Sequence, residues 1–153
     1  YFESVLNAKV PTMTSDTAPS GKVLYGSVKG ANYAWQAFDG NDNTLWAGDT
    51  ATTNYIGYKF TSPVSIGKFY RKGLIEDSGY SNYWRYRVEY SDDGTNWTSI
   101  GSSTQFTNKE QTVNVPNGYG SHLYWRLYLD GSKGNYSTTY NTYTIQFWGR
   151  KDV

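Results

Sequence analysis

Residues 84–90 read Trp-Arg-Tyr-Arg-Val-Glu-Tyr, and this stretch decides the class of fold. Its aromatic and aliphatic side chains occupy the even positions, whereas its charged side chains occupy the odd positions. A period of two is typical of a β-strand that turns one face to a hydrophobic core and the other to water. The segment therefore predicts an amphipathic strand, with Trp84 on the core side.

The same alternation recurs along the rest of the chain. The alternating runs cover residues 56–60, 64–69, 113–115, 122–129 and 143–147. An irregularity is expected at Gly67, and turn-forming clusters such as Asp92-Asp93-Gly94 separate the runs without an intervening helical pattern. Strands at fairly regular spacing, joined by turns, predict an all-β antiparallel sandwich or barrel.

Composition narrows the classes of function. The chain has 153 residues, a formal net charge of +1, 6 Trp, 16 Tyr, 6 Phe and no Cys. This length suits one domain, and the aromatic residues supply the apolar area that a disordered chain lacks. A near-zero net charge excludes strong electrostatic binding of nucleic acid. No apolar run approaches the roughly 20 residues that span a bilayer. The long loops carry little Leu, Phe or Met and no basic cluster, so a membrane surface is not an expected partner either.

Motifs for catalysis are missing from the sequence. The single histidine, His122, lies on the polar side of a predicted strand, where we interpret it as a surface or pairing residue. No nucleophile elbow, P-loop, dinucleotide fingerprint or zinc pattern accompanies it. Glu76 and Asp77 are the best pair of acids, but adjacent residues rarely face each other across a substrate. These observations favour a binding module over an enzyme.

The segment Asp39-Gly40-Asn41-Asp42-Asn43-Thr44 is the best candidate for a metal site. Calcium takes six to eight oxygen ligands, and this turn offers carboxylates, carbonyls and a hydroxyl. Asp and Asn are also common in turns that are closed by hydrogen bonds alone. On the residues alone, both interpretations stay open.

Four stretches in order resemble the discoidin-like, or coagulation factor 5/8 type C, family and the similar family 32 carbohydrate-binding modules. They are residues 37–46, residues 55–60 with Pro63 and Ile66, residues 86–97 and residues 145–149. The resemblance covers residues 10–149 and implies a jelly-roll β-sandwich of about eight strands, of the galactose-binding-domain type. Residues 1–9 would then be a linker or an added strand, and residues 150–153 a boundary to a following region.

The ends of the module suggest a narrower likeness. Residues 10–15 and 149–153 look most like modules of phage or prophage tail and baseplate proteins. The resemblance implies a non-catalytic module, extracellular or on a virion, that adheres to bacterial cell-surface saccharide and contacts other subunits of a larger assembly. Two alternatives stay open: a structural or protein-docking sandwich in a virion, and a binding module of a secreted glycoside hydrolase or adhesin.

The resemblance also assigns roles to residues. Trp46, Trp97 and Phe147 would be core. Trp35, which shortly precedes residues 37–39, could belong to the core or to the site, and we favour the core. Ligand-binding side chains would lie on the loops at one end of the sandwich: Tyr33, Arg71, Glu76, Asp77, Tyr80, Asn82, Tyr83, Tyr136 and Tyr140. Aromatic rings would stack on the C–H face of a sugar, and the polar groups would bind its hydroxyls.

A structural calcium ion would take side-chain oxygens from Asp39 and Thr44, and carbonyl oxygens from Asp42 and nearby residues. Many relatives add a glutamate five residues before the final glycine, where this chain has Thr144. The sequence therefore leaves calcium binding open, and it does not identify the sugar.

Overall fold

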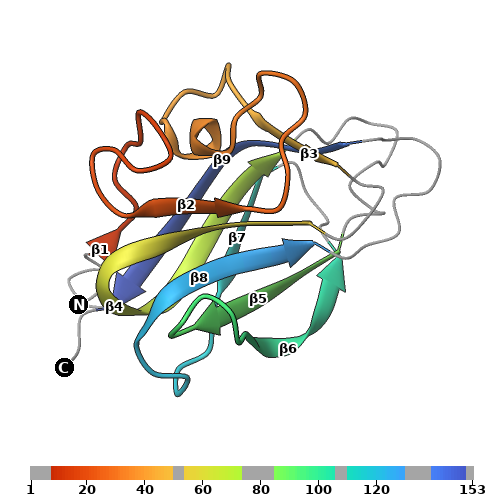
Figure 1. Ribbon diagram of the computed structural model, residues 1–153. Helices are drawn as coiled ribbons and strands as arrows, with labels where there is room; N and C mark the ends of the chain where they lie inside the picture. The colour runs from red at the N-terminus through yellow and green to blue at the C-terminus, as the bar shows by residue number, and fades with distance from the viewer. Residues whose placement is uncertain (1–7, 50–53, 74–84, 106–109, 130–138, 151–153) are drawn as a thin grey trace.

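The computed structural model describes residues 8–49, 54–73, 85–105, 110–129 and 139–150, and they form an all-β domain (Figure 1). The strands are β1 (Ala8–Lys9), β2 (Lys22–Tyr25), β3 (Trp46–Asp49), β4 (Asn54–Gly73), β5 (Arg85–Ser91), β6 (Thr98–Gln105), β7 (Glu110–Asn114), β8 (His122–Leu129) and β9 (Thr139–Arg150). One short 3-10 helix, η2, covers Ala34–Phe38. The predicted class, an antiparallel β-sandwich, is confirmed.

Strand β4 belongs to both layers of the sandwich. Residues 54–64 pair with β2 and β8, and β8 pairs in turn with β5, which pairs with β6; we call this layer the β8 sheet. Residues 65–73 pair with β7 and β9, and β9 also pairs with β1 and β3; we call this layer the β9 sheet. The two runs predicted at 56–60 and 64–69 are therefore one long strand. Pro63, which cannot donate to a ladder, lies where β4 leaves its pairing with β8.

The irregularity predicted at Gly67 is confirmed. The β4–β9 register runs from Ile66 opposite Gly149 to Lys68 opposite Trp148, so Gly67 is the extra residue of a bulge. The carbonyl of Gly67 accepts a hydrogen bond of 2.8 Å from the backbone N–H of Val115. The bulge therefore bends β4 and connects it to the segment after β7.

Large aromatic side chains fill the space between the two sheets. Trp46, Trp125, Phe69 and Phe147 are fully buried, which confirms the predicted core roles of Trp46 and Phe147. The Trp125 indole N–H donates to the carbonyl of Val64 at 3.0 Å, so its one polar atom is satisfied in the interior.

Trp97 does not belong to this core, and that prediction was wrong. It is only half-buried and lies on the outer face of the β8 sheet. The guanidinium carbon of Arg126 is 3.8 Å from the centroid of its ring, and the Tyr124 ring meets it edge-on. Trp97 directly precedes β6, so the ring covers outward-facing side chains of β8.

The outer face of β5 also differs from the prediction of a wet surface. Glu89 occupies an odd position of the opening segment, yet it is 4% exposed. Its Oε1 atom accepts from Arg126 Nε at 2.9 Å, and its Oε2 atom accepts from the Ser99 hydroxyl at 2.6 Å. Partner side chains cover the carboxylate, which a period of two does not reveal.

The predicted alternation along β9 holds at Ile145 and Phe147, which are buried, but not at Tyr143. Lys72 lies opposite Thr144 and Gly73 lies opposite Thr142, so Tyr143 is the extra residue of a second bulge. The bulge puts Thr142 in the interior and leaves Tyr143 half-buried.

The start of the described chain adds a strand to the β9 sheet. Ala8 and Lys9 form β1 and pair with Gly149 and Trp148 of β9. Residues 1–7 and 151–153, which complete the predicted linker and boundary, lie outside the described residues. Among the described residues, no helix has the length and apolarity to cross a membrane.

Candidate functional site

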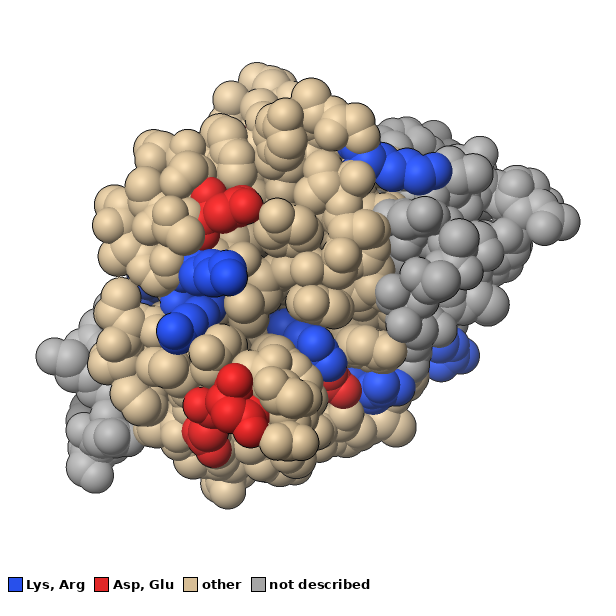
Figure 2. Space-filling model, in the orientation of Figure 1, with Lys and Arg blue, Asp and Glu red and all other residues tan. Residues whose placement is uncertain are grey.

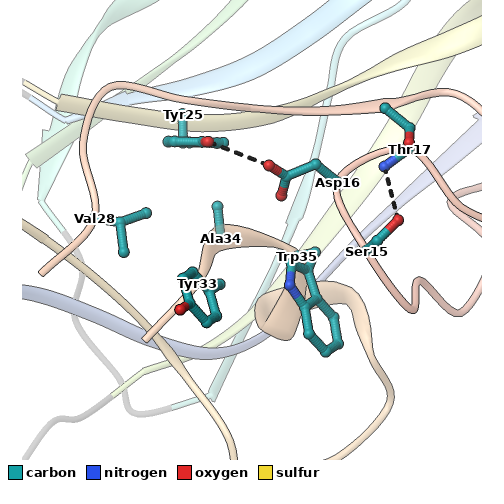
Figure 3. A pocket seen from close by; sticks show the side chains of 8 residues that line it. All are labelled: Ser15, Asp16, Thr17, Tyr25, Val28, Tyr33, Ala34 and Trp35. Atoms are coloured by element: carbon teal, nitrogen blue, oxygen red, sulfur yellow. Dashed lines mark hydrogen bonds between the residues drawn. The ribbon is translucent and has the colours of Figure 1, made fainter. Parts of the chain in front are cut away.

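A hollow of about 320 Å³ lies between the turn at residues 15–17, the end of β2 and the start of η2. Figure 3 shows the eight residues that line it: Ser15, Asp16, Thr17, Tyr25, Val28, Tyr33, Ala34 and Trp35. Sites for small ligands measure about 300–1,000 Å³, so this hollow suits a small ligand. In Figure 1, the loops around η2 lie over β2, on the side of the sandwich away from β5 and β6.

One wall of the hollow is aromatic. Tyr33 is 49% exposed, and within the described residues only Tyr33 and Tyr119 are exposed large hydrophobic side chains. Trp35 is half-buried and packs against the core, while Ala34 between them is fully buried. The backbone N–H of Tyr33 donates to Gln36 Oε1 at 3.0 Å, which fixes the start of η2. The Tyr33 ring is therefore exposed to solvent, while the residues that follow it are packed against the core.

The loop that leads to this wall is held by a buried amide. Asn54, the first residue of β4, is 2% exposed, and its Oδ1 accepts from the backbone N–H groups of Gly26 and Ser27 at 3.1 and 3.2 Å. The backbone of Lys29 donates to the carbonyl of Ala47 in β3 at 2.7 Å. These bonds pre-organise the loop, which reduces the entropy lost when a ligand binds.

The opposite wall carries a carboxylate. Asp16 Oδ2 accepts from the Tyr25 hydroxyl at 3.2 Å, as Figure 3 shows. The negative charge of Asp16, together with partial burial, raises the pKa of Tyr25 above its ordinary value, so the phenol stays protonated and donates. The Ser15 hydroxyl oxygen accepts from the backbone N–H of Ala18 at 3.0 Å and holds the turn in place. An anionic acceptor thus faces the two rings across the hollow.

A second hollow, of about 330 Å³, adjoins the first. Asp16 and Tyr25 line both, and Lys22, Leu24 and Tyr55 are among the other residues of the second. The Asp16–Tyr25 pair therefore lies between two neighbouring depressions, an arrangement that offers room on both sides of one carboxylate.

The charge around this region is mixed. In the face shown in Figure 2, Lys and Arg side chains lie in small groups among neutral and acidic residues. Among the described residues of this face, no field of one sign spreads over the surface, so a partner would be bound there through local contacts.

The sequence of this domain matches one family model. The model, described as NedA-like, galactose-binding domain, belongs to the F5/8 type C group and matches residues 36–127, more than half of the chain. The chain belongs to this family. The hollow is lined by residues that precede the matched range, so the match itself does not include it.

Several solved structures with the same fold are carbohydrate-binding modules. Chitosan-binding module 1 of a chitosanase/glucanase from Paenibacillus sp. IK-5 is 20% identical, with a TM-score of 0.68, over 88% of this chain and 99% of the module. A family 32 module of Clostridium perfringens NanJ, in complex with galactose, is 12% identical, with a TM-score of 0.64, over 84% of this chain and 93% of the module. Identities this low establish the shared sandwich fold alone. No curated protein matches the sequence.

The predicted ligand residues of this F5/8 type C domain are only partly described. Tyr33 lines the hollow. Tyr140 lies in β9 opposite Gly48 of β3, and its side chain is outside the described part. The remaining loop positions lie outside the described residues: Glu76, Asp77, Tyr80, Asn82, Tyr83 and Tyr136. Asp16, Tyr25 and Val28 were missed, because only the folded chain brings the turn at Asp16 against the end of β2 and the loop that follows it.

Arg71 has an interior position instead of the expected place on a ligand rim. Its side chain is 2% exposed, its Nε donates to the Thr142 hydroxyl at 3.1 Å, and its Nη2 donates to the carbonyl of Asn141 at 2.8 Å. Burial lowers the pKa of the guanidinium below its ordinary value. Position 71 lies within β4, between β7 and β9, so the side chain fastens β4 to the bulged part of β9.

The structure groups two of the predicted calcium ligands, Asp39 and Thr44. The Thr44 hydroxyl lies 2.5 Å from Asp39 Oδ2 and 3.0 Å from the carbonyl oxygen of Asn41, which groups one carboxylate, one hydroxyl and one carbonyl. The side-chain carboxylate of Asp42 accepts hydrogen bonds from Lys72 and Thr144 instead. Within the described ranges, no three His, Cys, Asp or Glu side chains gather in one place. Calcium takes six to eight oxygens, and the three oxygens grouped here fall short of that number, so on their own they do not fit the expected ion.

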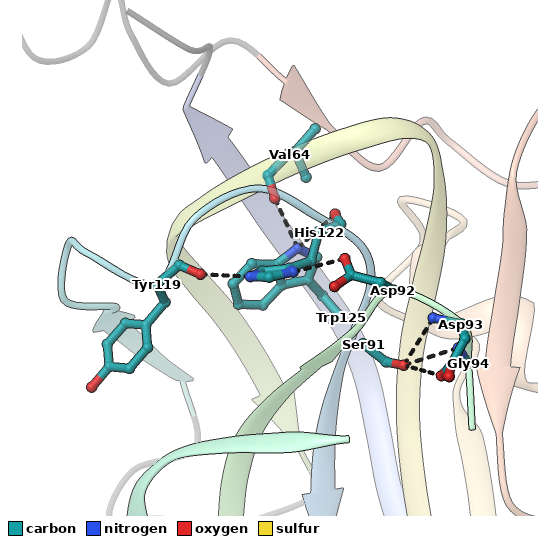
Figure 4. Close-up of polar contacts among 8 residues, drawn as sticks. All are labelled: Val64, Ser91, Asp92, Asp93, Gly94, Tyr119, His122 and Trp125. Atoms are coloured by element: carbon teal, nitrogen blue, oxygen red, sulfur yellow. Dashed lines mark hydrogen bonds and ion pairs between the residues drawn. The ribbon is translucent and has the colours of Figure 1, made fainter. Parts of the chain in front are cut away.

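His122 is a pairing residue, as interpreted from the sequence (Figure 4). Its Nδ1 lies 2.9 Å from Asp92 Oδ1 and its Nε2 lies 2.5 Å from the carbonyl oxygen of Tyr119. Its ring stacks on Tyr90, with the centroids 3.8 Å apart. His122 therefore clamps the turn after β5 to the turn before β8.

Proposed function

We propose that this domain is a non-catalytic module that binds saccharide in the hollow between Tyr33, Trp35 and Asp16. The observation that carries the proposal is the pairing of an exposed aromatic wall with a carboxylate across a hollow of about 320 Å³. A sugar ring has an apolar C–H face and a rim of hydroxyls. The two kinds of wall match these two surfaces.

The family and the fold support this proposal. Relatives with the same sandwich include a chitosan-binding module and family 32 modules in complex with galactose and with GalNAc-β-1,3-galactose. We infer that the ligand of this chain is a saccharide of the same broad class. The second hollow beyond Asp16 would take the next sugar unit of a chain or branch.

The proposed saccharide ligand indicates where the module would work and what kind of protein would carry it. A module for cell-surface polysaccharide would work outside the cell, as part of a secreted glycoside hydrolase, an adhesin, or a phage tail or baseplate protein. The relatives that come from glycoside hydrolases favour the first of these. Weak binding at one hollow gains strength when several copies are joined in one assembly.

Affinity measurements on matched variants test the proposal. Wild-type protein would be titrated by calorimetry with galactose, N-acetylgalactosamine, chitosan oligosaccharides and cell-wall polysaccharide. We expect binding to at least one, with a loss of about tenfold or more for Tyr33→Ala, since 1.4 kcal/mol of lost stacking corresponds to tenfold. Tyr119→Ala is the matched control, because Tyr119 is the other exposed ring and lies near His122 (Figure 4).

Two results would overturn the proposal. One is the absence of binding to every member of the panel at millimolar ligand. The other is equal weakening by Tyr33→Ala and Tyr119→Ala, which would mean that the hollow contributes nothing specific.

A further inference from the structure

Two side chains of the β9 sheet hold the carboxylate of Asp42. Lys72 Nζ donates to Asp42 Oδ2 at 3.0 Å, and the Thr144 hydroxyl donates to Asp42 Oδ1 at 2.5 Å. Lys72 on β4 and Thr144 on β9 lie directly opposite each other in the ladder. Cross-strand partners place their side chains on the same face of a sheet, so both donors reach one carboxylate together.

The charges of the pair support each other. The hydrogen bonds from Thr144 and from Lys72 hold the pKa of Asp42 below its ordinary value of 3.8. The hydrogen bond to Asp42 and the negative charges of Asp42 and Glu110 raise the pKa of Lys72 above 10.5. Glu110 lies opposite Lys72 on β7, the other neighbour of β4. The contact is therefore between a full carboxylate and a full ammonium over the whole neutral range.

The rest of the turn is closed by its own hydrogen bonds. Asp39 Oδ1 accepts from the backbone N–H of Asn41 at 2.9 Å, and Asp39 Oδ2 accepts from Thr44. The carbonyl of Phe38, just before the turn, accepts from the backbone N–H of Met13 at 2.9 Å. Both carboxylates of the segment thus have donors from the chain itself.

A divalent ion at this turn would compete with Lys72. It would take the backbone carbonyl of Asp42, next to the carboxylate that the ammonium holds, and the ammonium would repel it. The residue that faces Lys72 across the ladder is Thr144, a neutral side chain that adds no charge to attract the ion.

We propose that the Lys72 ammonium does the work of a metal ion in this domain, fastening the 39–44 turn to the β9 sheet through Asp42. The domain is then independent of calcium for folding and for ligand binding. This inference is separate from the proposed saccharide site, because the two share no residue.

Thermal unfolding with and without calcium tests the inference on the intact domain. The melting temperature of the wild type should differ by less than about 1 °C between excess calcium chloride and excess EDTA, a shift worth well under 1 kcal/mol. Calorimetric titration with calcium chloride should give no saturable heat. A saturable heat, or a melting temperature that rises with calcium, would overturn the inference.

Two lysine variants distinguish the contact between Lys72 and Asp42 from the general effect of removing one positive charge. Lys72→Met should lower the melting temperature equally in calcium and in EDTA. Lys68→Met is the matched control: Lys68 is on the same strand and lies 4.9 Å from the Trp148 ring centroid, so its loss removes one charge without touching Asp42. A larger loss for Lys68→Met than for Lys72→Met would count against the fastening role.

The double variant Lys72→Met with Thr144→Glu should gain calcium dependence. It replaces the cation with an apolar chain and adds a carboxylate beside Asp42. With calcium at one hundred times the dissociation constant, its melting temperature should rise by about 5–10 °C. A folded double variant that ignores calcium would contradict the claim that Lys72 excludes the ion. If this variant does not fold, the wild-type titration decides alone.

Discussion

Replacing Glu89 should cost this domain a large part of its stability. The Glu89 side chain is 6% exposed and the Arg126 side chain 11% exposed, and Arg126 Nη2 lies 2.7 Å from Glu89 Oε1. The Ser99 hydroxyl occupies the other carboxylate oxygen at 2.6 Å. Arg126 is also stacked against the Trp97 ring, so it cannot swing out to water without losing that contact. Removal of the carboxylate would leave a covered guanidinium without its counter-charge.

The size of the effect follows from this burial. Breaking a buried ion pair by removing one partner costs about 3–5 kcal/mol, against total stabilities of about 5–15 kcal/mol. For a domain of this length, each kcal/mol lowers the melting temperature by roughly 2–4 °C. Glu89→Ala should therefore lower it by about 10 °C. Glu89→Gln, which keeps the shape and one acceptor, should lose less.

Chemical denaturation and thermal melting of matched variants provide the assay. Glu110→Gln is the control, since Glu110 is exposed and accepts from the Tyr70 hydroxyl at 2.7 Å. Exposed charges contribute about 0–1 kcal/mol, so the control should change little. A cycle of Glu89→Gln, Arg126→Met and the double variant should give a coupling energy of about 2 kcal/mol or more.

The stability difference between the wild type and Glu89→Gln should depend on pH in a definite direction. Burial raises the pKa of Glu89, but the hydrogen bonds from Ser99 and Arg126 and the charges of Arg126 and Arg87 outweigh it, so the pKa lies below 4.5. A lowered folded-state pKa gives stability that is present above the unfolded pKa and is lost as the pH falls through the folded one. The gap between wild type and Glu89→Gln should thus be full at pH 7 and shrink below about pH 4.5. The reasoning fails if Glu89→Gln costs no more than Glu110→Gln at pH 7.

Two further substitutions follow from close contacts. Arg71→Met should lower the free energy of unfolding by about 2 kcal/mol, because it removes the buried donor to the Thr142 hydroxyl and to the Asn141 carbonyl. Denaturant titration measures this loss, and an unchanged denaturation midpoint would contradict the interior role of Arg71. Gly57→Ala should cost about 1–3 kcal/mol of unfolding free energy, because a Cβ there would lie 2.2 Å from the carbonyl oxygen of Trp125 in β8. Gly101→Ala is the control: a Cβ there meets nothing within 4 Å, so only the φ of +70° costs it, about 1 kcal/mol. Equal losses for the two variants would refute the clash at Gly57.

Alternation predicted the strands well where one face meets the core. Trp125, Leu127 and Leu129 on β8 and Ile145 and Phe147 on β9 are buried as the period of two requires. The pattern depends only on neighbours along one strand. It therefore holds wherever the register is regular.

The failures have a common physical origin in contacts between strands. Trp97 lies outside the core because its ring packs against Arg126 and Tyr124 on the outer face of another strand, β8. Glu89 is covered because Arg126 and Ser99 close over it. The bulge at Tyr143 shifts the faces of β9, and nothing in its local sequence indicates it.

The candidate site was predictable only in part for the same reason. Tyr33 was identified as an aromatic residue in a polar loop, and it does line the hollow. Asp16 and Tyr25 were not identified, since they lie at a turn and at a strand end that contact each other only in the folded chain. Arg71 was placed on the ligand rim by analogy, whereas its position inside β4 determines its burial.

The most direct test of the account is to observe which residues a bound saccharide touches. The chain has six tryptophans, so the indole N–H signals in a ¹⁵N-labelled sample are few enough to assign individually. On titration with the best ligand of the panel, the indole of Trp35 and the backbone signals of Asp16 and Tyr33 should shift together and saturate. Signals of the buried Trp46 and Trp125 should stay in place. Saturable shifts confined to other parts of the domain, with Trp35, Asp16 and Tyr33 unmoved, would contradict the assignment of the hollow as the saccharide site.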